Sequence, residues 1–157
     1  NMVVEKAGAV WDTLGFPPSI DSSVSSIIPP RYNLDSGIIT AVEVFMVQNT
    51  AYTNVFNFTL KVSTGGVGEY LPVITPEVTV TNNVSSTGAY IMNKHSFLFP
   101  SSIPFSKDDT IFIQLVRNGT SGIDVNAGSI MLLGARILYT SNGPTSIGSG
   151  TYSIPEW

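Results

Sequence analysis

The fold of this chain is decided by residues 109–140, DTIFIQLVRNGTSGIDVNAGSIMLLGARILYT. Its first arm, residues 110–117, is rich in β-branched and aromatic residues, and its second arm, residues 129–140, is apolar at nearly every position. Both compositions favour a buried strand. Between the arms, Asn118-Gly119 and Ser121-Gly122 are typical turn pairs. We therefore expect two long antiparallel strands that pair as a hairpin with an extended polar tip.

Similar strand signals recur along the rest of the chain. In residues 54–63, apolar residues alternate with polar ones, which indicates a strand with one face in a core and one in water. No segment carries a sustained helical period, and turn-forming residues recur at short intervals. The sequence therefore predicts an all-β fold, an antiparallel jelly-roll or Greek-key β-sandwich. The strands expected besides the two arms are residues 37–49, 54–63, 77–83 and 89–99.

The length of 157 residues suits one domain, so we expect a single jelly-roll domain over residues 1–157. Residues 1–36 are interpreted as an N-terminal arm made of one strand and a loop, in which the Ser-rich stretch forms a surface loop or an edge segment. Pro100 and Pro104 are expected to bound a loop. Residues 141–157 are rich in small and turn-forming residues, and we expect them to run over the surface as a C-terminal tail.

Composition excludes several classes of partner. Charged residues make up 11% of the chain, the formal net charge is -4 and the pI is about 4.7. No cluster of Lys and Arg is present to bind phosphates, so we expect no nucleic acid partner. We expect no membrane insertion, because no apolar run reaches the length of a span and no signal peptide is visible. The absence of cysteine excludes disulfides and thiolate metal sites. Low charge favours self-association.

Residues that could carry chemistry are few, and we predict no catalytic site and no cofactor. His95 is the sole histidine and is interpreted as a polar residue at a strand end. The adjacent Asp108 and Asp109 would point to opposite sides of an extended backbone, so a turn-capping role is expected. Asp124 and Asn126 offer hard oxygen ligands for calcium. Their loop lacks the dense acidic spacing of calcium loops, so no metal site is predicted, although an ion there stays an alternative.

The sequence does not identify ligand-binding residues. Asn57, Asn83 and Asn118 lie in N-x-S/T sequons, which a chain so rich in Asn, Ser and Thr produces by chance. The Gly-rich run at residues 65–68 is followed by no helix and no Lys-Ser or Lys-Thr pair, so it is interpreted as a plain connection. Aromatic residues could stack on sugar rings, although the sequence does not say which converge. They are Trp11, Tyr52, Tyr70, Tyr90, Tyr152 and Trp157.

The second arm of the central stretch is apolar on both faces, which predicts a contact between subunits. One face fills the core, and the other must be covered, because a monomer rarely leaves a large contiguous apolar surface in water. We expect a second copy to cover it, with coverage by the chain's own loops or tail as the alternative. Arg136 would then need a carboxylate or carbonyl partner, which a neighbouring copy could supply. The interface residues predicted are Ile130, Leu132, Arg136 and Leu138.

The same stretch resembles the C-terminal signature of small bacteriophage virion proteins. The resemblance rests on Asp109 before a strand ending in Arg117, an Asp-containing loop, Ala127-Gly128, and the segment LGARILYT at residues 133–140. It covers about a fifth of the chain closely. The chain departs from the pattern in lacking Trp-rich first strands. The resemblance implies a jelly roll similar to tumour-necrosis-factor folds, often trimeric, in tail appendages, needle knobs or surface decorations.

From these observations we expect a non-enzymatic structural protein of a virus particle, located in the virion, of the tail-tip or needle-knob type. Its expected partners are itself, as a trimer, other virion proteins, and a glycan or protein of the host surface. The alternatives are a capsid decoration protein and a free carbohydrate-binding module. An enzyme comes last, because no nucleophile and base pair is available.

Overall fold

The computed structural model describes residues 2–6, 9–28, 36–50, 54–66, 78–85, 88–143 and 146–154. Side chains are described for 15–28, 36–50, 54–66, 78–85 and 88–140. All regular elements in this part of the chain are strands, and every pair of them is antiparallel. They are β1 (Met2–Lys6), β2 (Ala9–Phe16), β3 (Asp21–Ile28), β4 (Gly37–Gln48), β5 (Val55–Gly65), β6 (Val78–Ser85), β7 (Met92–Phe105), β8 (Thr110–Asn118), β9 (Ile130–Gly143) and β10 (Ser146–Ile154).

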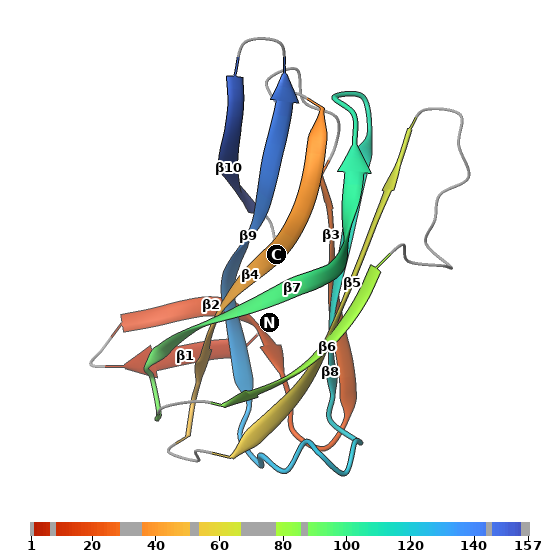
Figure 1. Cartoon of the computed structure of the whole chain (residues 1–157). Coiled ribbons are helices and arrows are strands. Elements are labelled where there is room, and N and C mark those ends of the chain that lie inside the picture. The colour runs from red at the N-terminus through yellow and green to blue at the C-terminus, as the bar shows by residue number, and fades with distance from the viewer. Residues whose placement is uncertain are drawn as a thin grey trace.

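The strands form two sheets, and the chain passes back and forth between them (Figure 1). The six-stranded sheet has the order β1-β2-β9-β4-β7, with β10 also paired to β9, and the four-stranded sheet has the order β3-β8-β5-β6. Each sheet thus interleaves early and late strands, which is the jelly-roll arrangement of two Greek keys. The predicted fold class, an antiparallel jelly-roll sandwich, is confirmed.

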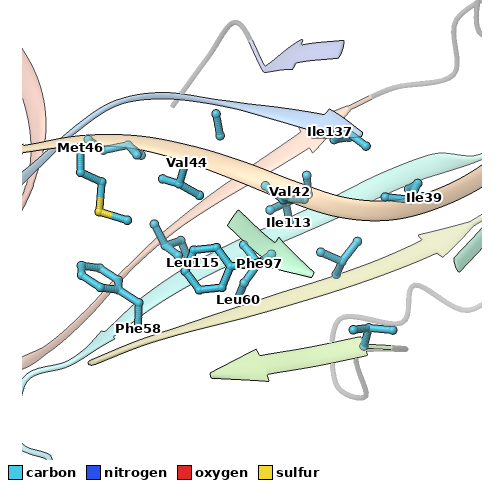
Figure 2. Packing of buried hydrophobic residues seen from close by; sticks show 14 of the residues in the cluster. Ile39, Val42, Val44, Met46, Phe58, Leu60, Phe97, Ile113, Leu115 and Ile137 are labelled. Atoms are coloured by element: carbon cyan, nitrogen blue, oxygen red, sulfur yellow. The ribbon is translucent and has the colours of Figure 1, made fainter. Parts of the chain in front are cut away.

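The core lies between the two sheets, where alternate residues of facing strands interdigitate (Figure 2). On β8 the alternation is strict, since its odd-numbered residues from Ile111 to Arg117 are buried and its even-numbered ones are partly exposed. Phe16 of β2 meets Phe58 of β5 edge to face, with ring centroids 5.2 Å apart. The fully buried side chains labelled in Figure 2 come from both sheets, and they include Val42, Val44, Phe58, Leu60, Phe97 and Leu115.

The predicted hairpin of the central stretch is wrong. Residues 110–117 and 130–140 do form strands, but β8 belongs to the four-stranded sheet and β9 to the six-stranded sheet. β8 pairs with β3 and β5, whereas β9 pairs with β2, β4 and β10. The apolar residues show correctly that each arm is buried. They do not show that the two arms lie in different sheets, which face the same core from opposite sides. The polar segment between them, residues 119–129, therefore crosses from one sheet to the other.

Three further expectations fail for related reasons. The arm at residues 1–36 contains three strands instead of one. Its Ser-rich stretch is β3, an edge strand of the four-stranded sheet, which confirms the edge-segment alternative. Ser23 and Ser25 are exposed, whereas Ser26 is buried. The expected loop between Pro100 and Pro104 lies within β7. Proline has no backbone N–H to donate. It is tolerated in β7 because β7 is an edge strand, and one of its sides has no partner strand that needs the hydrogen bond.

The expected surface tail at residues 141–157 is also largely a strand. β9 continues to Gly143, and β10 pairs with its residues from Ala135 to Gly143. β2 occupies that same side of β9 only from Ile130 to Leu132. The rest of that edge would otherwise present unpaired backbone groups, which β10 satisfies without needing apolar side chains.

Gly119 lets two connections of the sandwich touch, and this gives a first prediction. A Cβ built at Gly119 would clash with the carbonyl group of Ile20, whereas one built at Gly122, in the same connection, would meet nothing within 4 Å. We expect Gly119→Ala to lower the free energy of unfolding by about 1–3 kcal/mol, the usual cost of overpacking. The control Gly122→Ala should leave it nearly unchanged. Urea denaturation of both variants measures this, and equal stability of the two would contradict the described contact.

Candidate functional site

One end of the sandwich carries four connections between strands, and we call it the loop end. The C-termini of β2 and β4 and the N-termini of β7 and β9 meet there in the six-stranded sheet, as the pairs Phe16 with Ile130 and Val47 with Met92 show. In the four-stranded sheet, Asp21 pairs with Asn118 at the same end. The loop end, at the bottom of Figure 1, is therefore defined here by the described residues 17–20, 49–50, 54, 88–91 and 119–129.

Arg117 organises the loop end from inside the core. The alternation of β8 turns Arg117 inward after Ile111, Ile113 and Leu115, and its side chain is 0% exposed. Its guanidinium binds the carboxylate of Asp124 through two parallel hydrogen bonds, from Nε to Oδ2 at 2.9 Å and from Nη2 to Oδ1 at 2.8 Å. The Asp124 side chain is also 0% exposed. A bidentate pair of this kind is the strongest form of ion pair that side chains make.

The remaining guanidinium protons all go to backbone carbonyls. Nη1 donates to the oxygens of Phe16 and Gly128, and Nη2 donates to the oxygen of Asn126. The group also lies over the ring of Phe56, 5.0 Å from its centroid. All five N–H groups of the buried guanidinium therefore have acceptors, which offsets the cost of taking its charge out of water.

The connection between β8 and β9 is fixed by further bonds to its neighbours. Asp124 Oδ2 accepts a second hydrogen bond, from the backbone N–H of Asn57, and the N–H of Val125 donates to the carbonyl of Val55. The side chain of Asn126 donates to the carbonyl of Asn54 and accepts from the N–H of Gly128. A segment of this length without regular structure is thus held in one conformation by side chain and backbone bonds.

These bonds leave Asp124 and Asn126 unsuited to hold calcium. Both carboxylate oxygens of Asp124 face N–H donors, and the side-chain oxygen of Asn126 accepts from Gly128. A cation there would have to displace the guanidinium of Arg117. Within the part of the chain described, no group of three or more His, Asp or Glu side chains could hold a metal ion. The oxygen-rich composition of the connection serves an internal ion pair instead.

A bulge in β9 changes which predicted interface residues face outward. Phe45 of β4 pairs with Gly134, but the next residue, Met46, pairs with Leu132, so Leu133 is extra on β9. The expectation that all even positions of β9 share one face is therefore wrong. Ile130 and Leu132 are 2% and 4% exposed in the core of the same chain.

Arg136 and Leu138 do lie on the outer face of the six-stranded sheet, as predicted for the even positions. Arg136 donates through Nε to Glu43 Oε2, so its carboxylate partner is in the same chain. Arg136 therefore does not need a carboxylate from a neighbouring copy. Leu138 lies in the row that pairs with Ala41 and Leu98 across the sheet.

Glu43 is the centre of a charged cluster on this outer face. Its Oε1 atom accepts from Lys94 Nζ at 2.6 Å and from Ser96 Oγ at 3.3 Å, while Arg136 occupies Oε2 and lies over the ring of Phe45. The hydrogen bond from Lys94 lowers the pKa of Glu43, and Arg136 adds to this against the opposing effect of burial. Two cations around one carboxylate leave a net positive charge on an acidic protein.

Apolar side chains surround this cluster on the outer face of the six-stranded sheet. Leu98 of β7 is 69% exposed and Leu133 at the bulge is 47% exposed. Ile38, Phe45 and Leu138 are partly exposed. In contrast, Val47 and Met131 form a small buried cluster. The outer face thus combines exposed leucines with one compact group of charges.

The outer face of the four-stranded sheet is polar. Asn118 donates to the side-chain oxygen of Asn57 at 2.6 Å, and Asn57 donates to that of Asn83 at 2.8 Å. Thr59 and Thr81 bond to each other in the next row. The three asparagines of the sequons therefore form one ladder across β8, β5 and β6, and Asn57 is only 5% exposed. Their shared position across the strands was not visible from the sequence.

The other predicted chemical residues do not converge. His95 pairs with Val44 in the middle of the ladder between β4 and β7, so it is not at a strand end, and it is half-buried. Asp109 accepts from the N–H of Ser106, the turn-capping role that was predicted, and Asp108 is exposed. Tyr90 is 36% exposed at the loop end. The other aromatic candidates, Trp11, Tyr52, Tyr70, Tyr152 and Trp157, lie outside the described side chains, as do residues 67 and 68 of the Gly-rich run.

Comparisons with known proteins do not place the chain in a family. No protein-family model and no curated protein matches it. Among solved structures, it is similar to a CocE/NonD family hydrolase from Staphylococcus aureus, with 12% sequence identity and a TM-score of 0.42. The likeness covers 88% of this chain but only 34% of that one, and at this level it carries no conclusion about activity. No helix in the described residues is suited to cross a membrane.

The Arg117 ion pair gives a prediction about stability. Arg117→Met leaves the buried charge of Asp124 without its cation and removes the guanidinium donors of three backbone carbonyls. Breaking a buried pair costs about 3–5 kcal/mol. The control is Arg136→Met, which breaks a pair at a side chain that is 36% exposed and should cost roughly 1 kcal/mol or less. Urea denaturation compares them, and an equal loss in both variants would refute the assigned role of Arg117.

The burial of His95 predicts a pH dependence. Burial lowers the pKa of His95 from its usual value of 6.5. The unfolded chain therefore binds the proton before the folded protein does, so stability is complete above about pH 6.5 and declines as pH falls below it. Because the pKa of Glu43 is lowered from 4.5, its contribution is lost only at lower pH. Denaturation midpoints between pH 7 and 5 should fall for the wild type and much less for His95→Gln, whereas parallel slopes would show that His95 is not responsible.

Proposed function

We propose that this chain is a non-enzymatic structural protein of a virus particle, of the bacteriophage tail-tip or needle-knob type, which self-associates as a trimer. In this proposal, the outer face of the six-stranded sheet forms the contact between copies, and other surfaces meet virion proteins and a glycan or protein of the host. Its place is the virion.

The observation that carries the proposal is the outer face around Glu43. Exposed leucines at 98 and 133 adjoin an arginine, and such a mixture of apolar residues with Arg is typical of subunit interfaces. Only 11% of residues are charged, so copies of the chain repel one another weakly. Exposed apolar side chains that gather on one face of a sheet are common where another subunit binds.

The resemblance to virion proteins supports the proposal from a second side. Its signature residues include Arg117, Asp124 and Gly128, which meet in the ion pair and carbonyl bonds that fix the loop end. The Leu-Gly of the signature, at 133–134, coincides with the bulge of β9. The signature thus consists of residues that shape the domain. Jelly rolls also build many viral capsids, which is support by analogy of fold alone.

A free carbohydrate-binding module is the second candidate, and the polar face of the four-stranded sheet favours it. Amide and hydroxyl groups such as those of Asn83 and Thr81 are the kind that bond to sugar hydroxyls. However, the amides of Asn57 and Asn118 already donate within the ladder. A monomer that binds glycans would favour this candidate, whereas a trimer favours the virion protein.

The proposal predicts a trimer in solution that depends on the outer face of the six-stranded sheet. The double variant Leu98→Ser, Leu138→Ser should weaken association at least about tenfold, because burial of apolar side chains drives it. Ile27→Ser is the matched control, since Ile27 is 64% exposed on the other sheet. Light scattering coupled to size exclusion gives the mass of each protein. A wild-type mass of one chain at all concentrations would overturn the proposal.

A further inference from the structure

The sequence contains two Asn-Gly pairs, at residues 118–119 and 142–143, and the side chains of the first pair are described. Asparagine is chemically labile, and a following glycine makes it more reactive because no Cβ hinders the next backbone nitrogen. That nitrogen can attack the Cγ atom of the asparagine side chain. A new bond from nitrogen to Cγ closes a five-membered succinimide ring, and the bond from Cγ to Nδ2 breaks. The side-chain nitrogen leaves as ammonia with the proton of the backbone N–H, and water then opens the ring to aspartate or isoaspartate.

The packing of the fold requires the glycine of the first pair. A Cβ at Gly119 would clash with the carbonyl group of Ile20, so no larger residue fits there without a shift of the backbone. Exchange of the second residue therefore cannot make the pair unreactive. The structure restrains the first residue, Asn118, instead.

The neighbouring strand β5 binds the side-chain amide of Asn118. Its Nδ2 atom donates to Asn57 Oδ1 at 2.6 Å and to Thr59 Oγ1 at 2.9 Å, so both of its protons have acceptors. Asn57 donates in turn to Asn83, and the hydroxyl of Thr59 bonds to that of Thr81. The amide group that would have to leave is therefore held by two bonds within a network that spans three strands. We call Asn118, Asn57 and Asn83 the asparagine ladder.

The backbone of Asn118 also opposes ring closure. Asn118 is the last residue of β8 and pairs with Asp21 of β3. In an extended strand the side chain stands roughly perpendicular to the sheet, so Cγ does not fold back onto the nitrogen of the next residue. Ring closure therefore requires that both side-chain hydrogen bonds break and that the end of β8 leaves the sheet.

The product of the reaction would destabilise the position at which it forms. An aspartate at position 118 has no N–H to donate, so its oxygens would face the side-chain oxygen of Asn57. It would also place a second carboxylate opposite Asp21, and like charges directly opposite each other on neighbouring strands are destabilising. The hydrogen bond from the backbone N–H of Thr120 lowers the pKa of Asp21, which is therefore ionised at neutral pH. Isoaspartate would lengthen the backbone next to Arg117, whose guanidinium fixes the loop end.

We infer that Asn118 is a self-modification site, and that the asparagine ladder keeps it unreacted for as long as this end of the four-stranded sheet stays closed. The backbone nitrogen of Gly119 is the nucleophile, and water is the only other reactant. Each opening of the end of β8 gives the reaction a chance to occur, and the reaction removes the hydrogen bonds that closed the sheet. Modification is therefore irreversible, and it loosens the loop end. The inference goes beyond the proposed function and does not depend on it.

The first test compares the folded protein with its own unfolded chain. The full chain is incubated in mildly alkaline buffer with and without urea, and peptide mapping by mass spectrometry follows aspartate and isoaspartate at position 118. The folded wild type should react at least about tenfold more slowly than the unfolded chain, because the reaction there requires a local opening of the sheet. Equal rates in the two samples would overturn the inference.

A matched pair of variants tests the ladder itself. Thr59→Val removes one acceptor of the Asn118 amide and should raise the rate in the folded protein about twofold to tenfold, which corresponds to one net hydrogen bond. Thr81→Val is the same change in the same row, but it does not touch Asn118 and should leave the rate unchanged. The pair at residues 142–143 is an internal reference, because general unfolding would raise both rates and loss of the ladder only that at Asn118. Equal rates at Asn118 in the two variants would show that the ladder is not what restrains it.

The consequence of the modification is tested with Asn118→Asp, which reproduces one of its products. The control is Asn83→Asp, which keeps an acceptor for Asn57 and does not lie opposite Asp21. Urea denaturation should give a lower midpoint for Asn118→Asp than for Asn83→Asp, and circular dichroism confirms that both variants are folded without urea. Equal midpoints would contradict the inference that modification of Asn118 loosens the fold.

Discussion

The guanidinium of Arg117 is the interaction on which the loop end of this jelly roll depends. It is fully buried, and each of its five N–H groups has an acceptor in the carboxylate of Asp124 or in a backbone carbonyl. These acceptors come from β2 and from the connection between β8 and β9, so one side chain joins the two sheets at their common end. Removing any one acceptor would leave a buried charge with an unpaired donor, which makes the arrangement cooperative.

This internal neutralisation shapes the surfaces of the protein. Because the charge of Asp124 is cancelled inside, the loop end presents apolar side chains and almost no charge to water. On the outer face of the six-stranded sheet, two cations, Lys94 and Arg136, surround the single carboxylate of Glu43 and leave a net positive charge at the surface. The third surface, on the four-stranded sheet, is a ladder of amides and hydroxyls bonded to one another. The three surfaces thus differ in chemistry, and each suits a different kind of contact.

The sequence predicts the class of fold because alternation along a strand is a local property. It does not predict which sheet a strand joins, so the stretch at residues 109–140 was expected to be a hairpin, although its arms lie in opposite sheets. The sequence assigned some residues of β9 to the wrong face of the sheet, because the bulge at Leu133 depends on pairing with β4. β10 was missed because its Ser and Gly residues carry no apolar period, although the free edge of β9 accommodates them. The role of Arg117 did have a signal, since it continues the buried positions Ile111, Ile113 and Leu115, and an aspartate follows within one connection.

The rigidity of the loop end is tested most directly by hydrogen exchange of single backbone amides, measured by NMR spectroscopy. The N–H groups of Val125 and Gly128 lie outside regular strands but donate to Val55 and Asn126, respectively. Their exchange is expected to be slow and comparable to that of amides in the centre of β8, because opening them requires breaking the bonds of Arg117. Fast exchange at Val125 and Gly128, while β8 stays protected, would show that the connection opens independently and would contradict a loop end fixed by Arg117.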